Sequence, residues 1–256
     1  KGGSPAMNKT DSYLTAECLC DEARLLSQLC HTSMEETDHW RWYRNIPGCW
    51  YHRIHIFSAN PNDPDFWRHL EQIYHAPEGD LILSFITEDL YPEWEEDLTQ
   101  RGFSLLKPQK GMVYDLPQWQ PTPQPSQIRR IFEEDIDDWS TAVSRGFGNL
   151  PAPEAYRQLI QDESNLFYAY EDRGMMVGTV QLYLDGNNAG IFNVSTLPEY
   201  RHKGIATALM RTVLNDAKAA GCSKASLQAS VYGEPVYQKM GFRVVNHFLN
   251  YTKKQQ

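Results

Sequence analysis

The sequence lacks any long apolar run. A helix that crosses a bilayer needs about 20 consecutive apolar residues, and no stretch of this 256-residue chain comes near that length. No basic segment followed by an apolar stretch stands near the first residues, so we expect no secretory signal. Residues 1–6, ahead of Met7, resemble a cloning remnant and do not enter the fold prediction. We therefore expect a globular, cytoplasmic protein that does not bind a membrane.

Cysteine is also scarce, with five in the chain. A small, odd number of thiols is typical of a reducing compartment and not of a disulfide-stabilised secreted domain. The residues that could suggest a zinc site are Cys18, Cys20, Cys30 and His31. Their Cys-x-Cys spacing within a helical pattern instead favours small buried thiols, so we predict no metal.

Positive charge is in deficit, and the net charge is −9. Residues 126–256 carry 14 basic and 14 acidic side chains, so the whole net charge lies in residues 1–125. Arginines and aromatics interleave over residues 40–44 and 50–53, a pattern that could stack nucleic-acid bases. The acidic background argues against nucleic acid and favours packing for these residues. It would suit a cationic substrate or partner, and it would equally serve solubility.

Prolines are concentrated at residues 117–125, where they exclude regular helix and inner strand and predict a linker. The chain is long enough for two domains of about 120–130 residues. We therefore predict an N-terminal α/β domain over residues 7–116 and a second domain over residues 126–256. In the first, helices are expected over 11–31, 65–74 and 91–100, and strands over 53–57 and 81–86.

The second half alternates strand and helix patterns in the order β-α-α-β-β-β-α-β-α-β-β, which predicts a mixed α/β sheet. Strands are expected over 128–132, 166–171, 176–184, 189–196 and 224–229, with two more after residue 242. Helices are expected over 135–145, 154–162, 204–220 and 234–240.

The helix start near Gly204 has the features of an anion site. A helix N-terminus offers unpaired backbone N–H groups and partial positive charge. Gly204 and Ala206 are small enough for a phosphate to approach, and residues 201–203 read Arg-His-Lys. The segment predicts a pyrophosphate cradle, although a glycine-rich helix start is also typical of a simple tight turn.

A second motif follows about thirty residues downstream, where residues 236–242 read Val-Tyr-Gln-Lys-Met-Gly-Phe. Together the two segments resemble the GNAT acetyltransferase superfamily over residues 126–256. In that family a strand leads into Val-x-Pro-x-x-Arg-Gly-x-Gly-Ile-Gly/Ala and a long helix, and Leu-Tyr-x-x-x-Gly-Phe follows. This chain has Pro198, Arg201 and Gly204 in place, and it departs mildly at Thr196 and His202.

The resemblance implies an N-acetyltransferase that uses acetyl-CoA. Backbone N–H groups of residues 202–207 would hold the CoA pyrophosphate, and the strand over 193–196 would pair with the pantetheine arm where it splays from its neighbour. A backbone N–H near Val194 would polarise the thioester carbonyl. The cofactor-binding residues so implied are Asn193, Val194, Ser195, Thr196, Arg201, His202, Lys203, Gly204, Ile205, Ala206 and Thr207.

Tyr237 is the catalytic residue implied by the resemblance. A phenol can protonate the departing CoA thiolate, although a tyrosine there could also only pack over the sulfur. The general base is left open, because residues 189–196 contain no Asp, Glu or His. The candidates are water held by Asn193 or Ser195, and the acidic run Glu133, Glu134 and Asp135. Cys222 has no histidine beside it in sequence and is expected to be structural.

The first half repeats part of the second. The strand–helix–Gly–Phe–strand order of residues 81–114 matches that of residues 227–251, which suggests a degenerate GNAT-like module. Its helix start has no glycine-rich turn, and Asp63 and Asp65 would repel a pyrophosphate. We therefore expect this half to wall the acceptor site or to be a structural partner.

The predicted reaction is transfer of an acetyl group to a primary amine of a small molecule, and the acidic first half would suit a cationic one. The alternatives are acetylation of a protein or peptide and a CoA-binding sensor without turnover. Nothing in the sequence decides between a monomer and a homodimer.

Overall fold

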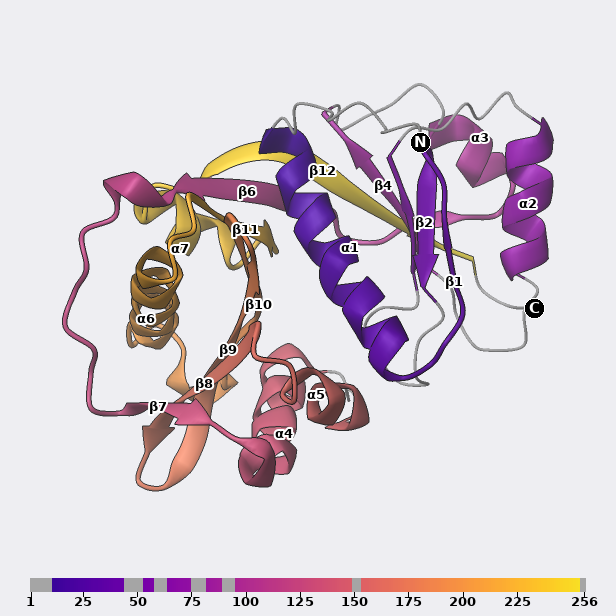
Figure 1. Cartoon of the computed structure of the whole chain (residues 1–256). Helices are drawn as coiled ribbons and strands as arrows, with labels where there is room; N and C mark the ends of the chain where they lie inside the picture. The colour runs from indigo at the N-terminus through magenta and orange to yellow at the C-terminus, as the bar shows by residue number, and fades with distance from the viewer. Residues whose placement is uncertain are drawn as a thin grey trace, which may run out of the picture.

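The computed structural model describes residues 11–43, 53–57, 64–74, 82–88, 95–148 and 153–253. Within these residues the strands form one mixed sheet in the order β1-β2-β3-β4-β12-β6-β11-β10-β9-β8-β7, with β5 pairing on β12. Figure 1 shows this sheet running through both halves of the chain, with helices packed against it. The predicted mixed α/β fold is confirmed.

The elements agree closely with the predicted spans in the second half. The strands are β1 (Met34–Glu36), β2 (Trp40–Tyr43), β3 (Arg53–Ile56), β4 (Ile82–Thr87), β5 (Ser104–Leu105), β6 (Gln109–Asp115), β7 (Ile128–Ile131), β8 (Asn165–Asp172), β9 (Met175–Asp185), β10 (Asn188–Thr196), β11 (Lys224–Ala229) and β12 (Arg243–Thr252). The α-helices are α1 (Asp11–Leu29), α2 (Pro64–Tyr74), α3 (Glu95–Gln100), α4 (Ile136–Phe147), α5 (Pro153–Leu159), α6 (Ile205–Ala219) and α7 (Glu234–Lys239). Short 3-10 turns are η1 (Leu116–Gln118), η2 (Glu133–Asp135) and η3 (Pro198–Tyr200).

The middle of the sheet reads the same from either side: a parallel pair, then an antiparallel step, on each side of the central β12–β6 pair. β3 and β4 pair in parallel, as do β10 and β11. β12 pairs antiparallel with β4, β6 pairs antiparallel with β11, and β12 and β6 pair with each other. Each half therefore places one strand against the other half, and Figure 1 shows β6 and β12 as the two long strands that join them. The strands on both sides of the predicted linker share one sheet.

The end of the chain differs from the prediction. Two strands were expected after residue 242, but the structure has the single strand β12. A register shift between Val244 and Asn246 bends this strand, so its first residues and its remainder run along different parts of β6. The remaining sheet position beside β11 is filled by β6 from the first half. Sequence patterns within residues 126–256 could not reveal this, because the pairing partner comes from outside them.

Three apolar clusters fill the faces of the sheet. Helix α6 packs on one face of the second half through Ile205, Leu209 and Val213, which recur at helical spacing. α4, α5 and α1 pack on the opposite face around Trp139. α2 and α3 cover the first half's strands through a separate cluster. Each helix thus buries one apolar stripe, and the halves meet along α1.

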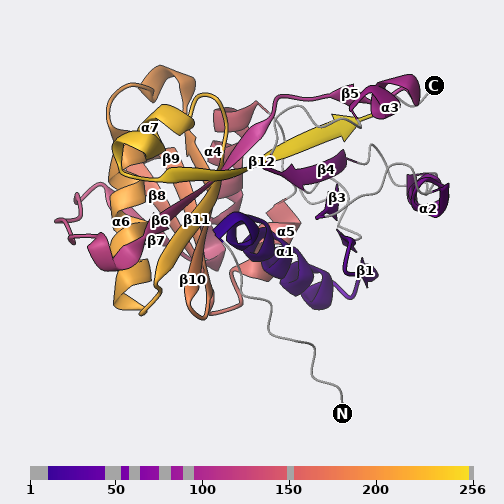
Figure 2. The same cartoon turned by 90° about the horizontal axis from the view of Figure 1, so that it is seen from above.

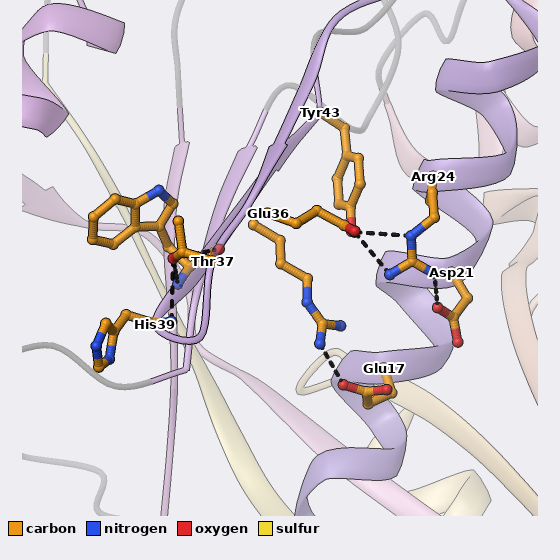
Figure 3. A network of polar contacts seen from close by, with 9 residues as sticks. Glu17, Asp21, Arg24, Glu36, Thr37, His39 and Tyr43 are labelled. Carbon is orange, nitrogen blue, oxygen red and sulfur yellow. Dashed lines mark hydrogen bonds and ion pairs between the residues drawn. The ribbon is translucent and has the colours of Figure 1, made fainter. Parts of the chain in front are cut away.

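Helix α1 lies between the two halves, as Figure 2 shows from above. Toward the first half it carries the charged network of Figure 3, in which Arg24 contacts Asp21 and Glu36, and Arg41 donates to Glu17 at 2.8 Å. Other polar contacts of α1 reach β12 and β11: Thr15 contacts Asn246 at 3.2 Å, and Gln228 donates to the Thr15 carbonyl at 2.7 Å. α1 therefore makes polar contacts with strands on both sides of it, β2 on one side and β12 and β11 on the other.

The predicted linker lies along α6. Trp119 Nε1 donates to Asn215 Oδ1 at 2.9 Å, and Asn215 Nδ2 donates to the Thr122 carbonyl at 2.8 Å. The domain boundary at residues 117–125 stays a prediction.

The aromatic–arginine segment of the first half packs where it is described. Trp40 and Trp42 lie against the apolar cluster of α2 and α3, whereas residues 44 and 50–52 fall outside the described part. Cys18, Cys20 and Cys222 are buried, and burial raises the pKa of the Cys20 thiol to about 12. In the described residues no group of His, Cys, Asp and Glu is arranged to hold a metal ion. No described helix has both the length and the apolar character needed to cross a membrane.

Candidate active site

Strand β10 is bulged where the pantetheine arm was predicted to pair. Its register with β9 shifts between Phe192 and Ser195, so the ladder skips Asn193 and Val194. Asn193 has a φ of +52°, in the left-handed region that few side chains adopt. Its side chain is fixed by Gln181 Oε1 at 2.7 Å, and its carbonyl accepts from Thr179 Oγ1 at 2.9 Å. The bulge turns this part of the strand away from regular pairing, which leaves its backbone able to meet a ligand.

The neighbouring strand pair opens at the same level. The parallel pairing of β10 with β11 ends at Ile191 and Leu227, although β10 continues to Thr196. A cavity of about 250 Å³ lies there. Its walls are Leu19, Arg53, His55, Gln109, Phe147, Ile191, Phe192, Asn193, Val194, Leu227, Gln228, Ser230 and Tyr237. The cavity thus brings together the predicted thioester-binding strand and the predicted acid.

Gly204 begins helix α6 in a conformation that suits glycine. Its φ is +78°, and no side chain caps the helix N-terminus. A Cβ built on Gly204 would meet no other atom within 4 Å, so the space above the first turn is open. The backbone N–H groups of Ile205, Ala206 and Thr207 belong to that first turn, where helical N–H groups have no partner within the helix. The geometry fits a bound phosphate.

The basic residues of the turn have different surroundings. The Arg201 guanidinium donates to the backbone carbonyls of Gly146 at 3.0 Å and Thr196 at 3.4 Å, so it ties the turn to β10. Lys203 Nζ lies 4.6 Å from the centre of the Tyr200 ring. His202, which stands where the resembling family has glycine, keeps the left-handed φ of +63°. The turn conformation is thus retained although its first glycine is replaced.

Tyr237 lies on α7 and lines the cavity with 7% of its surface exposed. A Cβ at Gly233 would come within 2.8 Å of its ring, so the ring packs directly on glycine backbone. Phe242 supports it, with ring centres 6.0 Å apart. Burial raises the pKa of Tyr237 above that of a free phenol. The side chain is therefore held in one place and stays protonated in the neutral range.

The structure separates the candidate bases. Glu133, Glu134 and Asp135 form η2, away from the residues that line the cavity. Asp135 accepts from Arg129 at 2.7 and 3.0 Å, and this pairing lowers the pKa of the carboxyl. Of the two residues proposed to hold water, Asn193 lines the cavity, whereas the Ser195 hydroxyl is bonded to Thr179 at 2.6 Å. Asn193 is thus the one of the two that lines the cavity, and its side-chain amide is also bonded, to Gln181 and Tyr156.

Sequence reasoning missed a buried side chain, Glu22 of α1, that is linked through Gln181 to Asn193 of the cavity lining. Gln181 Nε2 donates to Glu22 and, at 2.8 Å, to Asn165, while Gln181 Oε1 accepts from Asn193. The Tyr156 hydroxyl bonds Asn193 from the other side at 3.3 Å. Glu22 was invisible in the sequence because it sits in an amphipathic helix of the other half, 159 residues before its partner.

The first half forms one wall of the cavity. Arg53 and His55 come from β3, Leu19 from α1 and Gln109 from the exchanged strand β6. His55 is fully buried, and burial together with the charges of Arg53 and Arg41 lowers its pKa to about 3. The cavity wall formed by the first half therefore contains a neutral imidazole.

The comparison with known families agrees with this geometry. A model of the acetyltransferase (GNAT) domain matches residues 130–250. A GCN5-related N-acetyltransferase from Kribbella flavida is 12% identical, with a TM-score of 0.65 over 92% of this chain and 96% of its own. A conserved protein of unknown function from Staphylococcus epidermidis is 15% identical, with a TM-score of 0.65 over 88% and 95%. A Drosophila protein is 14% identical, with a TM-score of 0.64 over 95% and 94%.

At these identities the solved structures establish the fold, and the similarity extends over both halves. The domain match covers the bulged strand, the α6 turn and α7. Residues 130–250 of this chain are therefore a GNAT acetyltransferase domain.

Proposed function

We propose that the protein transfers the acetyl group of acetyl-CoA to a primary amine of a small molecule, by direct attack within a ternary complex. The observation that carries this proposal is the separation of β10 from β11 after Ile191 and Leu227, in a cavity lined also by Tyr237. A slot between two strands suits a pantetheine arm, and the uncapped start of α6 suits its pyrophosphate. Acetyl-CoA, when bound, supplies the activated acetyl group.

The residues of the cavity then have distinct tasks. The backbone around Val194 lies outside the β9 ladder and would donate to the carbonyl oxygen as negative charge develops on it. A water held by Asn193 would take the proton of the attacking amine. Tyr237 would give its proton to the sulfur that leaves, and the proton lost by the amine restores the phenol through solvent. The sum is one amide formed, one thioester broken and one free thiol.

A small acceptor is favoured over a peptide because the first half contributes part of the cavity lining and so narrows the space beside Val194. Leu19, His55 and Gln109 line the cavity together with Val194, and a volume of about 250 Å³ accommodates a compact molecule. The acidic first half would attract an amine in its ammonium form before it loses its proton. This supports a single active site served by both halves.

The test is release of CoA from acetyl-CoA over a panel of small primary amines and short peptides, with CoA affinity measured separately by calorimetry. Turnover with small amines is the expected result. Turnover confined to peptides would transfer the proposal to protein acetylation, and CoA binding without release with any amine would identify a sensor.

A further inference from the structure

One charged side chain, that of Arg53, lines the active-site cavity in the described part of the chain. Neither aspartate nor glutamate stands among the described lining residues. The histidine of the lining, His55, is neutral, because burial and the nearby charges of Arg53 and Arg41 lower its pKa to about 3. A molecule that enters the cavity therefore meets a single positive charge, although the chain as a whole has a net charge of −9.

Arg53 faces the cavity side of the first half's sheet. Successive side chains of a strand face opposite sides. Ile54 and Ile56 of β3 belong to the apolar cluster under α2 and α3, so Arg53 and His55 face the other side, and both line the cavity. His55 is fully buried, whereas Arg53 is half-buried and keeps exposed surface. Of the two, Arg53 is therefore the residue that a ligand can reach.

The surroundings of Arg53 strengthen its attraction for an anion. Much of the lining is apolar, as at Leu19 and Leu227, and charges are poorly screened beside apolar walls. Gln109 and Gln228 also line the cavity, and their amide groups can bond to a ligand but carry no charge. An anionic group in this cavity would thus be attracted by Arg53, whereas a second cationic group would be repelled.

A carboxylate matches a single arginine better than a phosphate does. Guanidinium and carboxylate groups are planar and form two parallel hydrogen bonds. One guanidinium balances the charge of one carboxylate, whereas a phosphate monoester carries more than one negative charge at neutral pH and would keep part of it uncompensated.

The acetyl group would be transferred in the same cavity, which is also lined by Val194 and Tyr237. We infer that the acceptor is a small amine that bears a carboxylate, which Arg53 binds while the amine lies beside Tyr237. This inference rests on the proposed function. It narrows the acceptor from any small primary amine to an amino acid, and it excludes the purely cationic molecule that the acidic first half would suit.

The experiment compares four primary amines of similar length, namely β-alanine, 3-aminopropanamide, butylamine and O-phosphoethanolamine. In CoA release, kcat/KM for β-alanine should exceed that for the amide and for butylamine by about tenfold to 100-fold, the factor that charge-assisted hydrogen bonds provide. Equal values for these three amines would overturn the inference. A higher value for O-phosphoethanolamine than for β-alanine would also overturn it, because the site would then select a phosphate.

Two variants of Arg53 test the contact itself. Arg53→Met removes the charge and should bring the ratio of β-alanine to 3-aminopropanamide close to one by raising the KM of β-alanine, with the KM of acetyl-CoA unchanged. Arg53→Lys keeps the charge but loses the planar pair of donors, so its ratio should be intermediate. It decides the question if Arg53→Met does not fold. An undiminished preference in either variant would contradict the inference.

Arg41 offers a matched control. It lies on β2 opposite His55 in the sheet register, and its charge also lowers the pKa of His55. It pairs with Glu17 at 2.8 Å, however, and does not line the cavity. Arg41→Met should therefore keep the preference for β-alanine. An equal loss of preference in Arg41→Met and Arg53→Met would mean that no direct contact with Arg53 is involved, which overturns the inference.

Failure of the proposed function would be recognised separately, as absence of CoA release with every amine. The carboxylate site is then judged by the melting temperature of the protein with propionate, which has the carboxylate but no amine, and with propanamide. Propionate should raise the melting temperature more than propanamide does, and this difference should vanish in Arg53→Met. Equal shifts in the unaltered protein, or a difference that persists in Arg53→Met, would count against the inference.

Discussion

Each half of the chain contains a strand followed by a short helix that ends at a glycine. The local structure of these two units is the same, but their side chains differ. In the second half β11 leads to α7, and Gly241 with a φ of +96° closes the helix. In the first half β4 leads to α3, and Gly102 with a φ of +85° does the same. The Phe242 amide donates to the Tyr237 carbonyl and the Phe103 amide to the Leu98 carbonyl, both at 3.0 Å. Leu98, fully buried in its own core, therefore occupies the place of Tyr237.

The first turns of α6 and α2 also differ, in the charge of their side chains. α6 begins at Gly204 beneath a basic turn with open space above it. α2 has an acidic first turn, in which exposed Asp65 pairs with Arg68 at 2.7 Å. Residues 58–63, including Asp63 of the sequence prediction, lie outside the described part. The two units thus share the glycine and the phenylalanine that close the helix, but Leu98 stands where the second half has a phenol, and the first turn of α2 is acidic where the turn before α6 is basic.

The largest expected effect comes from closing the cradle that distinguishes the second half. Gly204→Glu introduces a side chain at a φ of +78° and a negative charge where a pyrophosphate would bind. We expect CoA affinity to fall by more than about 100-fold, since the lost backbone contacts and the new repulsion act together. Calorimetric titration with CoA measures the loss.

The matched control lies at the other end of the same helix. Gly221 has a φ of +86°, and a Cβ there also meets no atom within 4 Å. Gly221→Glu should therefore cost similar folding stability and leave CoA affinity intact. If both variants weakened CoA binding equally, the cradle assignment would be wrong.

A smaller effect is expected from making Tyr237 resemble its first-half counterpart. Tyr237→Phe keeps the packing on Gly233 and removes only the proton donor, so kcat should fall by about 100-fold. Tyr114→Phe is the control, because Tyr114 also contacts Phe242, with ring centres 5.4 Å apart, but does not line the cavity. An unchanged rate in Tyr237→Phe would leave the residue with a packing role only.

The same residue predicts a pH dependence. The acid must be protonated to act, and burial raises its pKa above the ordinary value of about 10. Activity should therefore show no loss from phenol ionisation between neutral pH and about pH 10, and any such loss should begin above that range. The kcat profile measures this, and a limb between pH 7 and 9 that disappears in Tyr237→Phe would contradict it.

The sequence predicted the second half well because its signals are local. Apolar spacing at Ile205 and Leu209 and the stop at Gly221 define α6 without reference to other segments. The fold of the first half was predicted less completely, and the hairpin of β1 and β2 was missed. The exchange of β6 and β12 could not be predicted, because strand pairing across about 130 residues leaves no periodic trace in either strand.

The residues of the candidate site also fall into those that a local sequence signal identifies and those that it does not. Gly204 and Tyr237 stand in motifs, so their segments could be identified from the sequence alone. His55 and Gln109 stand in alternating segments, and only the packing of the halves brings them to the cavity. Glu22 stands in an amphipathic helix, and the same packing brings it to Gln181. A residue that matters through its place in the sheet has no sequence signal of its own.

A further expected effect concerns the carboxylate by which the first half supports the second. Glu22→Ala removes one of the two acceptors of Gln181 Nε2 and leaves a small void in a fully buried place. We expect a loss of about 2 kcal/mol in the free energy of unfolding, measured in urea, and a lower kcat as Asn193 loses its support. Glu154→Ala, an exposed carboxylate on α5, should change stability by less than about 0.5 kcal/mol.

A conservative variant separates two roles of this carboxylate. Glu22→Gln keeps an oxygen that can accept from Gln181, so it should restore most of the stability and activity if Glu22 only positions the network. Activity as low as that of Glu22→Ala, with stability restored, would show that the charge itself is needed. The first half would then contribute to the reaction as well as to the cavity lining.

The smallest expected effect concerns His202, in the turn that precedes α6. His202 holds a left-handed φ of +63° where glycine would be unstrained, so His202→Gly should stabilise the protein by about 0.5–1 kcal/mol. Arg173→Gly offers the control, because Arg173 has a φ of +51° in the β8–β9 turn, far along the chain from α6. Both variants should raise the melting temperature by similar amounts, but only His202→Gly should alter CoA affinity. A change in affinity alone, without a gain in stability, would mean that the histidine is held by its ligand contacts and carries no backbone strain.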